Sequence, residues 1–154
     1  KICKMVKKRG GDPWMPASVY SKGLSGLSVN LLVNDVAASV VFAETVLGAK
    51  AVYADPDFAV LKIDTAACIA EWILHADHTY ADHPLSGFVG EQDGRGIGAE
   101  FRLHGLDPDD AESRARAAGY TVLAGAADKA HGLRETYILD DDGYCWTPDR
   151  PVNA

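Results

Sequence analysis

Hydrophobic and polar positions change their period several times in the first half of the chain, and each change predicts a new element. LSVNLLV (27–33) alternates as a strand does, whereas VAASVVFAETVL (36–47) places apolar residues at 36, 40, 43 and 47, on one stripe of a helix. Asp35 and Gly48 flank this run, and they are residues that begin and end helices. Three short apolar runs follow, at 49–53, 58–63 and 67–74. The pattern therefore predicts the order β-α-β-β-β.

The same order recurs in the second half. A strand is predicted at 98–104 and a helix at 109–118, with Asp107 as its cap and Gly119 at its end. Three more strands are predicted at 120–125, 133–139 and 144–148. Matching positions of the two halves are separated by roughly 72 to 76 residues, which indicates an internal repeat. The chain is thus predicted to contain module one at 27–74 and module two at 98–148.

Three stretches of the repeat resemble a known family: VNLLVNDVAASVVFAETVLGA, EFRLHGLDPDDAESRARAAGY and HGLRETYILDDDGYCW. Over about residues 27–150 the sequence resembles the vicinal oxygen chelate superfamily, which includes glyoxalase I, extradiol dioxygenases, fosfomycin-modifying enzymes and bleomycin-binding proteins. The resemblance implies an α+β fold in which two βαβββ modules in tandem form a shared curved-sheet cavity, with helices outside. It also implies a homodimer, in some members with the cleft between chains. One fold hosts many chemistries, so the resemblance alone assigns no activity.

Strand alternation indicates which side chains face the cavity, because successive side chains point to opposite faces of a sheet. Ser28 and Asn30 share the more polar face of the first strand of module one. The corresponding face in module two carries Glu100, Arg102 and His104. We expect both faces to line the cavity. Arg102 and His104 could hold an anionic or polar ligand group there, or Arg102 could pair internally with Glu100.

Metal-dependent members of the superfamily hold their ion with four side chains, usually His or Glu, from the first and last strands of each module. The corresponding positions in this sequence are Ser28, Glu71, Glu100 and Thr147. Hydroxyls are weak ligands, and two glutamates alone suit a hard cation rather than zinc or iron. We therefore expect no metal and no other cofactor. A Mg²⁺ or Mn²⁺ site completed by waters stays open. Without a metal, Glu71 and Glu100 are expected to converge as acidic walls of one cavity.

HADHTYADHP (75–84) is the densest cluster of histidines, with His75, His78 and His83 in nine positions. The separation of His78 and His83 occurs in some zinc sites, but a metal also needs further convergent ligands. Because the stretch follows the last strand of module one, we expect a loop at the cavity rim that is not part of the sheet. It could contact the ligand or be solvated.

Three further inferences concern other side chains. By alternation, Trp72 and Trp146 are expected to turn toward the helices as core residues. One of Arg134 and Glu135 is expected to face the cavity. GRGIG (94–98) runs into a strand rather than a helix, so it is interpreted as a flexible linker between the modules and not as a dinucleotide-binding motif.

Charge is divided unevenly along the chain. Residues 1–22 carry a net charge of +5, so the total of −7 leaves −12 for residues 23–154. A domain with this negative charge disfavours binding of nucleic acid and favours binding of a cationic ligand. No apolar run approaches the roughly 20 residues of a membrane-spanning helix. Residues 1–22 are interpreted as a disordered extension, with a packing or binding arm as the alternative, and residues 23–150 as the domain.

Two functional classes follow. The first is a metal-independent protein resembling bleomycin-resistance proteins, which binds or sequesters a small molecule such as a cationic drug. The alternative is a metal-dependent lyase or isomerase resembling glyoxalase, or a transferase resembling fosfomycin-modifying enzymes, that uses Glu71 and Glu100. The three cysteines are odd in number and widely spaced, which favours a reducing, cytoplasmic location. Whether any reaction is catalysed stays open.

Overall fold

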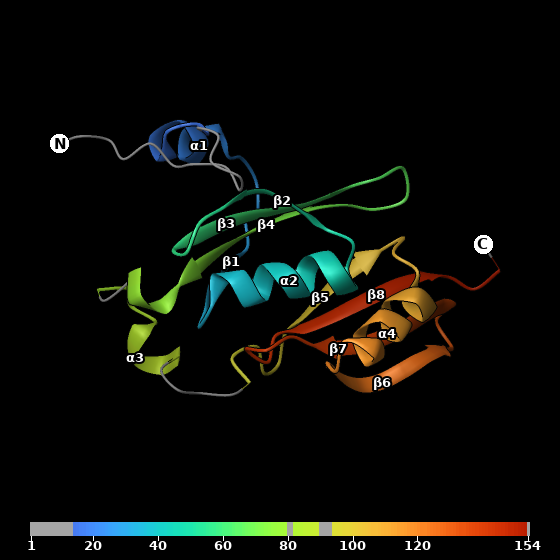
Figure 1. Ribbon diagram of the computed structural model, residues 1–154. Coiled ribbons are helices and arrows are strands. Elements are labelled where there is room, and N and C mark those ends of the chain that lie inside the picture. The colour runs from blue at the N-terminus through green and yellow to red at the C-terminus, as the bar shows by residue number, and fades with distance from the viewer. Residues whose placement is uncertain (1–13, 80–81, 90–93, 154) are drawn as a thin grey trace.

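Two four-stranded sheets make up the protein, whose computed structural model describes residues 14–79, 82–89 and 94–153 (Figure 1). Module one consists of β1 (Asn30–Val33), α2 (Val36–Val46), β2 (Lys50–Ala54), β3 (Phe58–Asp64) and β4 (Ile69–Ala76). Module two consists of β5 (Glu100–His104), α4 (Pro108–Ala117), β6 (Thr121–Asp128), β7 (Leu133–Leu139) and β8 (Cys145–Pro151). Outside the modules lie α1 (Ala17–Gly23), a 3-10 helix (Asp77–Thr79) and α3 (Ser86–Val89). The predicted α+β fold of two βαβββ modules is confirmed.

The two sheets share one topology. Their strand orders are β1-β4-β3-β2 and β5-β8-β7-β6. In each sheet the first and last strands of the module pair in parallel, and the remaining pairs are antiparallel. This pairing places the first strand beside the last one, so polar side chains of β1 and β4, or of β5 and β8, become neighbours on one face. None of the helices in the described residues is both long enough and apolar enough to span a bilayer.

The helix boundaries follow the predicted capping residues. The Asp35 carboxylate accepts a hydrogen bond from the Ala38 amide at 3.1 Å. Asp107 accepts from the amides of Asp109 and Asp110 at 2.9 and 3.2 Å. These bonds satisfy amide groups that have no partner within the helix. Gly48 and Gly119 follow the two helices with φ of 66° and 82°, a backbone conformation that glycine adopts readily.

Two strand boundaries of module one differ from the prediction. The strand expected at 27–33 begins at Asn30, where pairing with Ile73 of β4 starts, so Ser28 precedes it. Strand β4 continues through Ala76 instead of ending at 74. The prediction that His75 lies in a loop outside the sheet is therefore wrong. The residue lies within β4 and pairs with Leu32 of β1 and Phe58 of β3. Pairing on both sides keeps the chain extended at this position.

The modules meet through the helix-facing sides of their sheets. Trp72 and Trp146 are 5% and 3% exposed, and their ring centroids are 4.9 Å apart. Phe42 of α2 reaches Tyr120 of module two with an edge-to-face contact at 4.9 Å. Both tryptophans are core residues, as predicted. The opposite sheet faces, which carry Glu71 and Glu100, are consequently turned away from this junction.

Arg95 joins the two modules at the turn between them. Its side chain is fully buried, and its guanidinium donates to both carboxylate oxygens of Asp77 at 2.8 and 2.7 Å and to the Leu32 carbonyl at 3.0 Å. A Cβ on Gly143 would lie 2.3 Å from the Cα of Gly94, so the two backbones cross in close contact. GRGIG (94–98) does connect the modules, as predicted, and the buried Arg95 and the close approach of Gly94 to Gly143 pack its first part against the rest of the protein.

The described part of the N-terminal arm, from residue 14 onward, packs against module one, which was the alternative to a disordered extension. Helix α1 lies over the sheet of module one, on the side opposite α2 (Figure 1). Trp14 stacks on Tyr53, and the Tyr20 hydroxyl bonds to Glu71. Aromatic side chains that find an apolar surface give an arm a reason to dock. Residues 1–13 of the extension lie outside the described residues.

Candidate functional site

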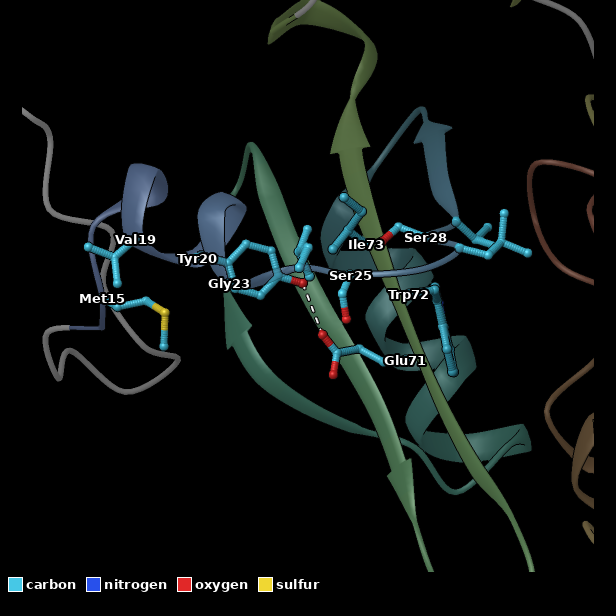
Figure 2. A pocket seen from close by; sticks show the side chains of 12 residues that line it. Met15, Val19, Tyr20, Gly23, Ser25, Ser28, Glu71, Trp72 and Ile73 are labelled. Carbon is cyan, nitrogen blue, oxygen red and sulfur yellow. Dashed lines mark hydrogen bonds between the residues drawn. The ribbon is translucent and has the colours of Figure 1, made fainter.

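Two cavities lie between α1 and the sheet of module one. The first, of about 550 Å³, is lined by Met15, Val19, Ser28 and Glu71 among others, and Figure 2 shows it from close by. The second, of about 480 Å³, has walls that include Trp14, Asn30, Asp55, Phe58 and His75. Tyr20, Leu24 and Ile73 line both cavities. These three side chains therefore lie between two adjacent cavities beneath the helix.

Aromatic rings form much of the wall of the second cavity. The Trp14 indole stacks on the Tyr53 ring with centroids 5.0 Å apart and an interplanar angle of 11°. Tyr20 approaches Phe58 edge-on at 6.2 Å, and Phe58 contacts the His75 ring at 4.7 Å. Such rings offer flat apolar surfaces and the negative faces that attract cations.

Glu71 brings charge to this space from β4. Its Oε1 atom accepts a hydrogen bond from the Tyr20 hydroxyl at 3.1 Å, and Figure 2 shows the two side chains pointing toward each other. Burial, the hydrogen bond and the negative charge of Glu71 together raise the pKa of Tyr20 to about 12, so its hydroxyl keeps its proton. Lys62 lies opposite Glu71 across β3 and β4, with its ammonium 3.9 Å from Asp64.

The other polar groups of the second cavity are held by neighbouring atoms. The Asp55 Oδ1 atom accepts from the amides of Asp57 and Phe58, both at 2.8 Å, and the Tyr53 hydroxyl donates to Oδ2. His75 Nδ1 lies 2.6 Å from the Asn30 side-chain oxygen. Because that oxygen only accepts, the imidazole must donate through Nδ1. Burial, and then the nearby His83, lower the pKa of His75 to about 4, so the ring is neutral near pH 7.

The predicted site residues of module one come together only in part. Ser28 and Glu71 line the first cavity, whereas Asn30 and His75 line the second. His78 and His83 belong to neither lining: His78 Nε2 lies 2.7 Å from Asp57 Oδ1, and His83 Nδ1 accepts the Leu85 amide at 3.0 Å. Their role at the cavity rim stays a prediction.

The predicted residues of module two form a separate polar network on the outer face of their own sheet. Arg102 donates to Glu100 at 2.9 Å, to Asp149 at 2.9 Å and to Glu135. His104 Nδ1 also lies 2.8 Å from Asp149. Burial acts to raise the pKa of Glu135, but hydrogen bonds from Tyr137 and Arg102 outweigh it and lower the pKa to about 2. Arg102 is thus paired with three carboxylates, which agrees with the internal pairing that was one of its two predicted roles.

Arg134 and Glu135 point to opposite sides of their sheet, as alternation requires, but neither lines a cavity with the other predicted site residues. Glu135, 2% exposed, shares the outer face of the sheet with Arg102, whereas Arg134 turns to the helix side and donates to Asp109 of α4 at 2.7 Å. The depth at which Glu135 is buried was not predicted.

Glu71 and Glu100 do not converge within one chain, contrary to expectation. Glu100 lines a third cavity, of about 640 Å³, with Leu123, Leu139 and Cys145, whereas Glu71 lines the first. The cause is the packing of the modules, which turns these two faces away from each other.

The four positions that hold metal in the superfamily do not fit a metal ion in this chain. The Thr147 hydroxyl donates to Glu100 Oε2 at 3.1 Å while Arg102 bonds to Oε1, so both oxygens are engaged. Glu71 lies on the other sheet, and Ser28 precedes β1. Across residues 14–79, 82–89 and 94–153, no group of three or more His, Cys, Asp or Glu side chains is arranged to hold a metal.

Sequence reasoning missed the side chains that build the cavity wall. Trp14 and Tyr20 fell within an arm that was predicted to be disordered or, alternatively, to pack or bind, and neither was singled out. Asp55 and Phe58 were not considered as site residues. Two large aromatic residues within a basic arm were a usable signal, because such side chains favour partly buried positions with a partner for their polar atom. Asp149 gave no comparable signal, since its partners Arg102 and His104 lie 47 and 45 residues away.

Residues 27–147 match the Glyoxalase/Bleomycin resistance protein/Dioxygenase superfamily. The chain belongs to this superfamily. The match spans both modules and leaves α1 outside. No curated protein matches the sequence. What distinguishes this member of the glyoxalase/bleomycin resistance superfamily must therefore come from its own residues.

Solved structures of the superfamily share the fold at low identity. A glyoxalase/bleomycin resistance protein/dioxygenase family enzyme from Burkholderia phytofirmans PsJN is 21% identical with a TM-score of 0.63, over 81% of this chain and 97% of that one. TioX from Micromonospora sp. ML1 is 23% identical with a TM-score of 0.59, over 84% and 98%. A virulence protein from Salmonella typhimurium is 22% identical with a TM-score of 0.57, over 84% and 98%. At these identities the likeness concerns the fold alone.

Proposed function

We propose that the protein binds a small cationic molecule with a planar aromatic part, on the face of the module one sheet that α1 covers. The observation that carries this proposal is a set of rings on one face of this sheet, Tyr53, Phe58 and the His75 imidazole, which share that face with the Glu71 carboxylate. Rings supply stacking surfaces, and a carboxylate supplies the charge-assisted hydrogen bond that orients a ligand amine. Ligand sites are typically concave and mostly apolar, with a few such polar groups.

The charge of the protein supports a cation over an anion. Residues 23–154 carry −12, and a field of that sign raises the local concentration of cations. The nearest cationic side chain to Glu71 in the sheet is Lys62 opposite, which has Asp64 as a neighbour at 3.9 Å. Arg102 is enclosed by three carboxylates on the other sheet. An anionic ligand would thus have little to bind on either face.

The binding is proposed to be independent of metal, and the protein to sequester its ligand rather than transform it. The alternative, a metal-dependent lyase, isomerase or transferase, needs Glu71 and Glu100 on one ion. Their positions on opposite outer faces give no support to it within one chain. We also propose a homodimer with twofold symmetry, the commonest symmetric assembly, as the superfamily resemblance implies.

A titration with proflavine, a planar tricyclic aromatic cation, tests this function. Glu71→Gln keeps the shape of the side chain and removes its charge, so we expect the Kd for proflavine to rise about tenfold, the effect of losing a charged hydrogen-bond partner. Asp110→Asn, on the exposed face of α4, removes the same charge far from the cavities and should leave the Kd unchanged. Tighter binding of the planar anion anthraquinone-2-sulfonate than of proflavine would contradict the proposal.

A further inference from the structure

Tyr20 occupies the middle of the proposed ligand space. Its side chain lines both cavities beneath α1, with its ring edge-on to Phe58 and its hydroxyl on Glu71. The Trp14 indole of the same arm stacks on the ring of Tyr53, and Tyr53 is fully buried. The arm thus occupies the two groups that would recognise a ligand: Trp14 covers the ring of Tyr53, and Tyr20 bonds to the carboxylate of Glu71.

Helix α1 itself is weakly attached. It has seven residues, none of them buried, and its N-cap Pro16 makes no side-chain capping bond. Helices of this length are not stable alone in water, so tertiary contacts must hold them. Trp14 and Tyr20 join the arm to the sheet through two ring contacts and one hydrogen bond. Met15, Val19 and Leu24 remain 39%, 56% and 39% exposed.

We propose that Trp14 and Tyr20 are internal occupants of the ligand site, and that a ligand binds by displacing them together with α1. The inference rests on the proposed function, and it deepens it by naming the ligand class. A ligand that replaces the indole on Tyr53 must be a flat ring system. One that replaces the Tyr20 hydroxyl on Glu71 must carry a hydrogen-bond donor on that ring system, such as an aromatic amine or a phenol.

Displacement of α1 and closure of α1 as a lid predict opposite changes in ligand affinity when the attachment of the helix is weakened. If α1 competes with the ligand, weakening its attachment raises the fraction of protein that can bind, and the apparent affinity rises with that fraction. If Trp14 and Tyr20 instead form part of the finished wall, removing their contacts lowers affinity. The two arrangements also differ in whether the amides of residues 17–23 become more or less protected when ligand is present.

The experiment compares proflavine binding by four forms of the full chain: the parent, Trp14→Ala, Tyr20→Phe and Ser18→Ala. Tyr20→Phe removes only the hydroxyl, and we expect it to bind proflavine about tenfold more tightly, from the loss of one charge-assisted hydrogen bond that must otherwise be broken. Trp14→Ala should also lower the Kd for proflavine. Ser18→Ala, on the same helix but lining neither cavity, is the matched control; because alanine favours a helix more than serine does, it should not tighten binding.

Hydrogen exchange supplies a second measurement on the parent chain. Addition of proflavine should speed exchange of the amides of α1 while slowing that of β4. Weaker binding by both Trp14→Ala and Tyr20→Phe, with slower exchange in α1, would overturn the displacement inference and leave the proposed function intact. Absence of proflavine binding by every form, including Tyr20→Phe, would overturn both. Equal binding of 10-methyl acridine orange, a planar cation in which methyl groups replace every N–H hydrogen, would overturn the requirement for a donor.

Discussion

Arg95 and Asp77 are joined by two parallel hydrogen bonds of 2.8 and 2.7 Å, and the guanidinium at the centre of this pair is fully buried. The same guanidinium lies 3.7 Å from Asp142, whose other partners include the Asn34 amide of module one at 3.0 Å. One cation therefore balances two carboxylates at the junction of the modules. Removing it leaves charge in a place that water reaches poorly.

The first prediction concerns this junction. Arg95→Ala should lower the free energy of unfolding by about 3 kcal/mol, the cost of breaking a buried ion pair from one side. Urea denaturation measures it. Arg116→Ala removes an arginine from the exposed pair with Glu112 on α4 and should cost about 0.5 kcal/mol or less. Equal losses for the two variants would show that the Arg95 contacts do not hold the modules together.

The second prediction concerns Asp140. Burial raises its pKa to about 6, although the Trp146 indole N–H and the Tyr144 amide donate to its carboxylate. The folded state thus binds its proton more tightly than the unfolded state, whose pKa is near 3.9. Asp140 therefore contributes most to the free energy of unfolding below about pH 4, and this contribution is lost as the pH rises through 6. The stability of the parent relative to Asp140→Asn should therefore increase as the pH falls from 7 to 4.

His75 is expected to oppose Asp140 in the same pH range. Its pKa is lowered to about 4, so folding favours the neutral ring, and this stability is lost as the pH falls from about 6.5 through 4. The variant His75→Gln should accordingly gain stability relative to the parent over that range. Urea titrations of both variants at several pH values separate the two groups. If the stabilities of a variant and of the parent change equally with pH, the pKa shift ascribed to the substituted residue is contradicted.

The third prediction concerns metal. Because Thr147 and Arg102 engage Glu100 while Glu71 lies on the other sheet, we expect no thermal shift with Zn²⁺, Ni²⁺ or Fe²⁺. Protein purified without chelator should contain substoichiometric transition metal by elemental analysis. A ligand at 100 times its Kd would stabilise the fold by about 2.7 kcal/mol. A cation effect of that size, abolished by Glu71→Ala or Glu100→Ala, would favour the metal-dependent alternative.

The fourth prediction concerns assembly. Light scattering is expected to give about twice 16.4 kDa, the mass of one chain. If a twofold dimer places module two of one chain against module one of the other, Glu100→Gln should also weaken proflavine binding. If the cavity beneath α1 acts within one chain, Glu100→Gln should have no effect while Glu71→Gln weakens binding. A monomer at micromolar concentration would contradict the dimer itself.

Local signals made most of the fold predictable. Asp35, Asp107, Gly48 and Gly119 act within a few residues of their own positions, so the limits of both helices were readable from the sequence. Alternation likewise placed Trp72 and Trp146 on the core side. It fixes a face of the sheet but not a partner, and for that reason the internal pairing of Arg102 stayed open.

The candidate site depends on contacts that the sequence does not announce. Tyr20 and Glu71 are 51 residues apart, and Arg95 lies 63 residues from Leu32. The relative orientation of the two modules decided that Glu71 and Glu100 separate, and it is set by tertiary packing of Trp72, Trp146 and Phe42. No periodicity within either module carries that information.

Because the modules meet through their helix-facing sides, each keeps one sheet face that contributes nothing to the junction. A substitution on such a face can alter what the protein recognises without disturbing the packing that both halves share. The present chain shows the outcome of that freedom: one half carries an aromatic hollow under a docked arm, and its duplicate carries a network of charges around Arg102. A repeated fold of this kind lets its two copies specialise separately.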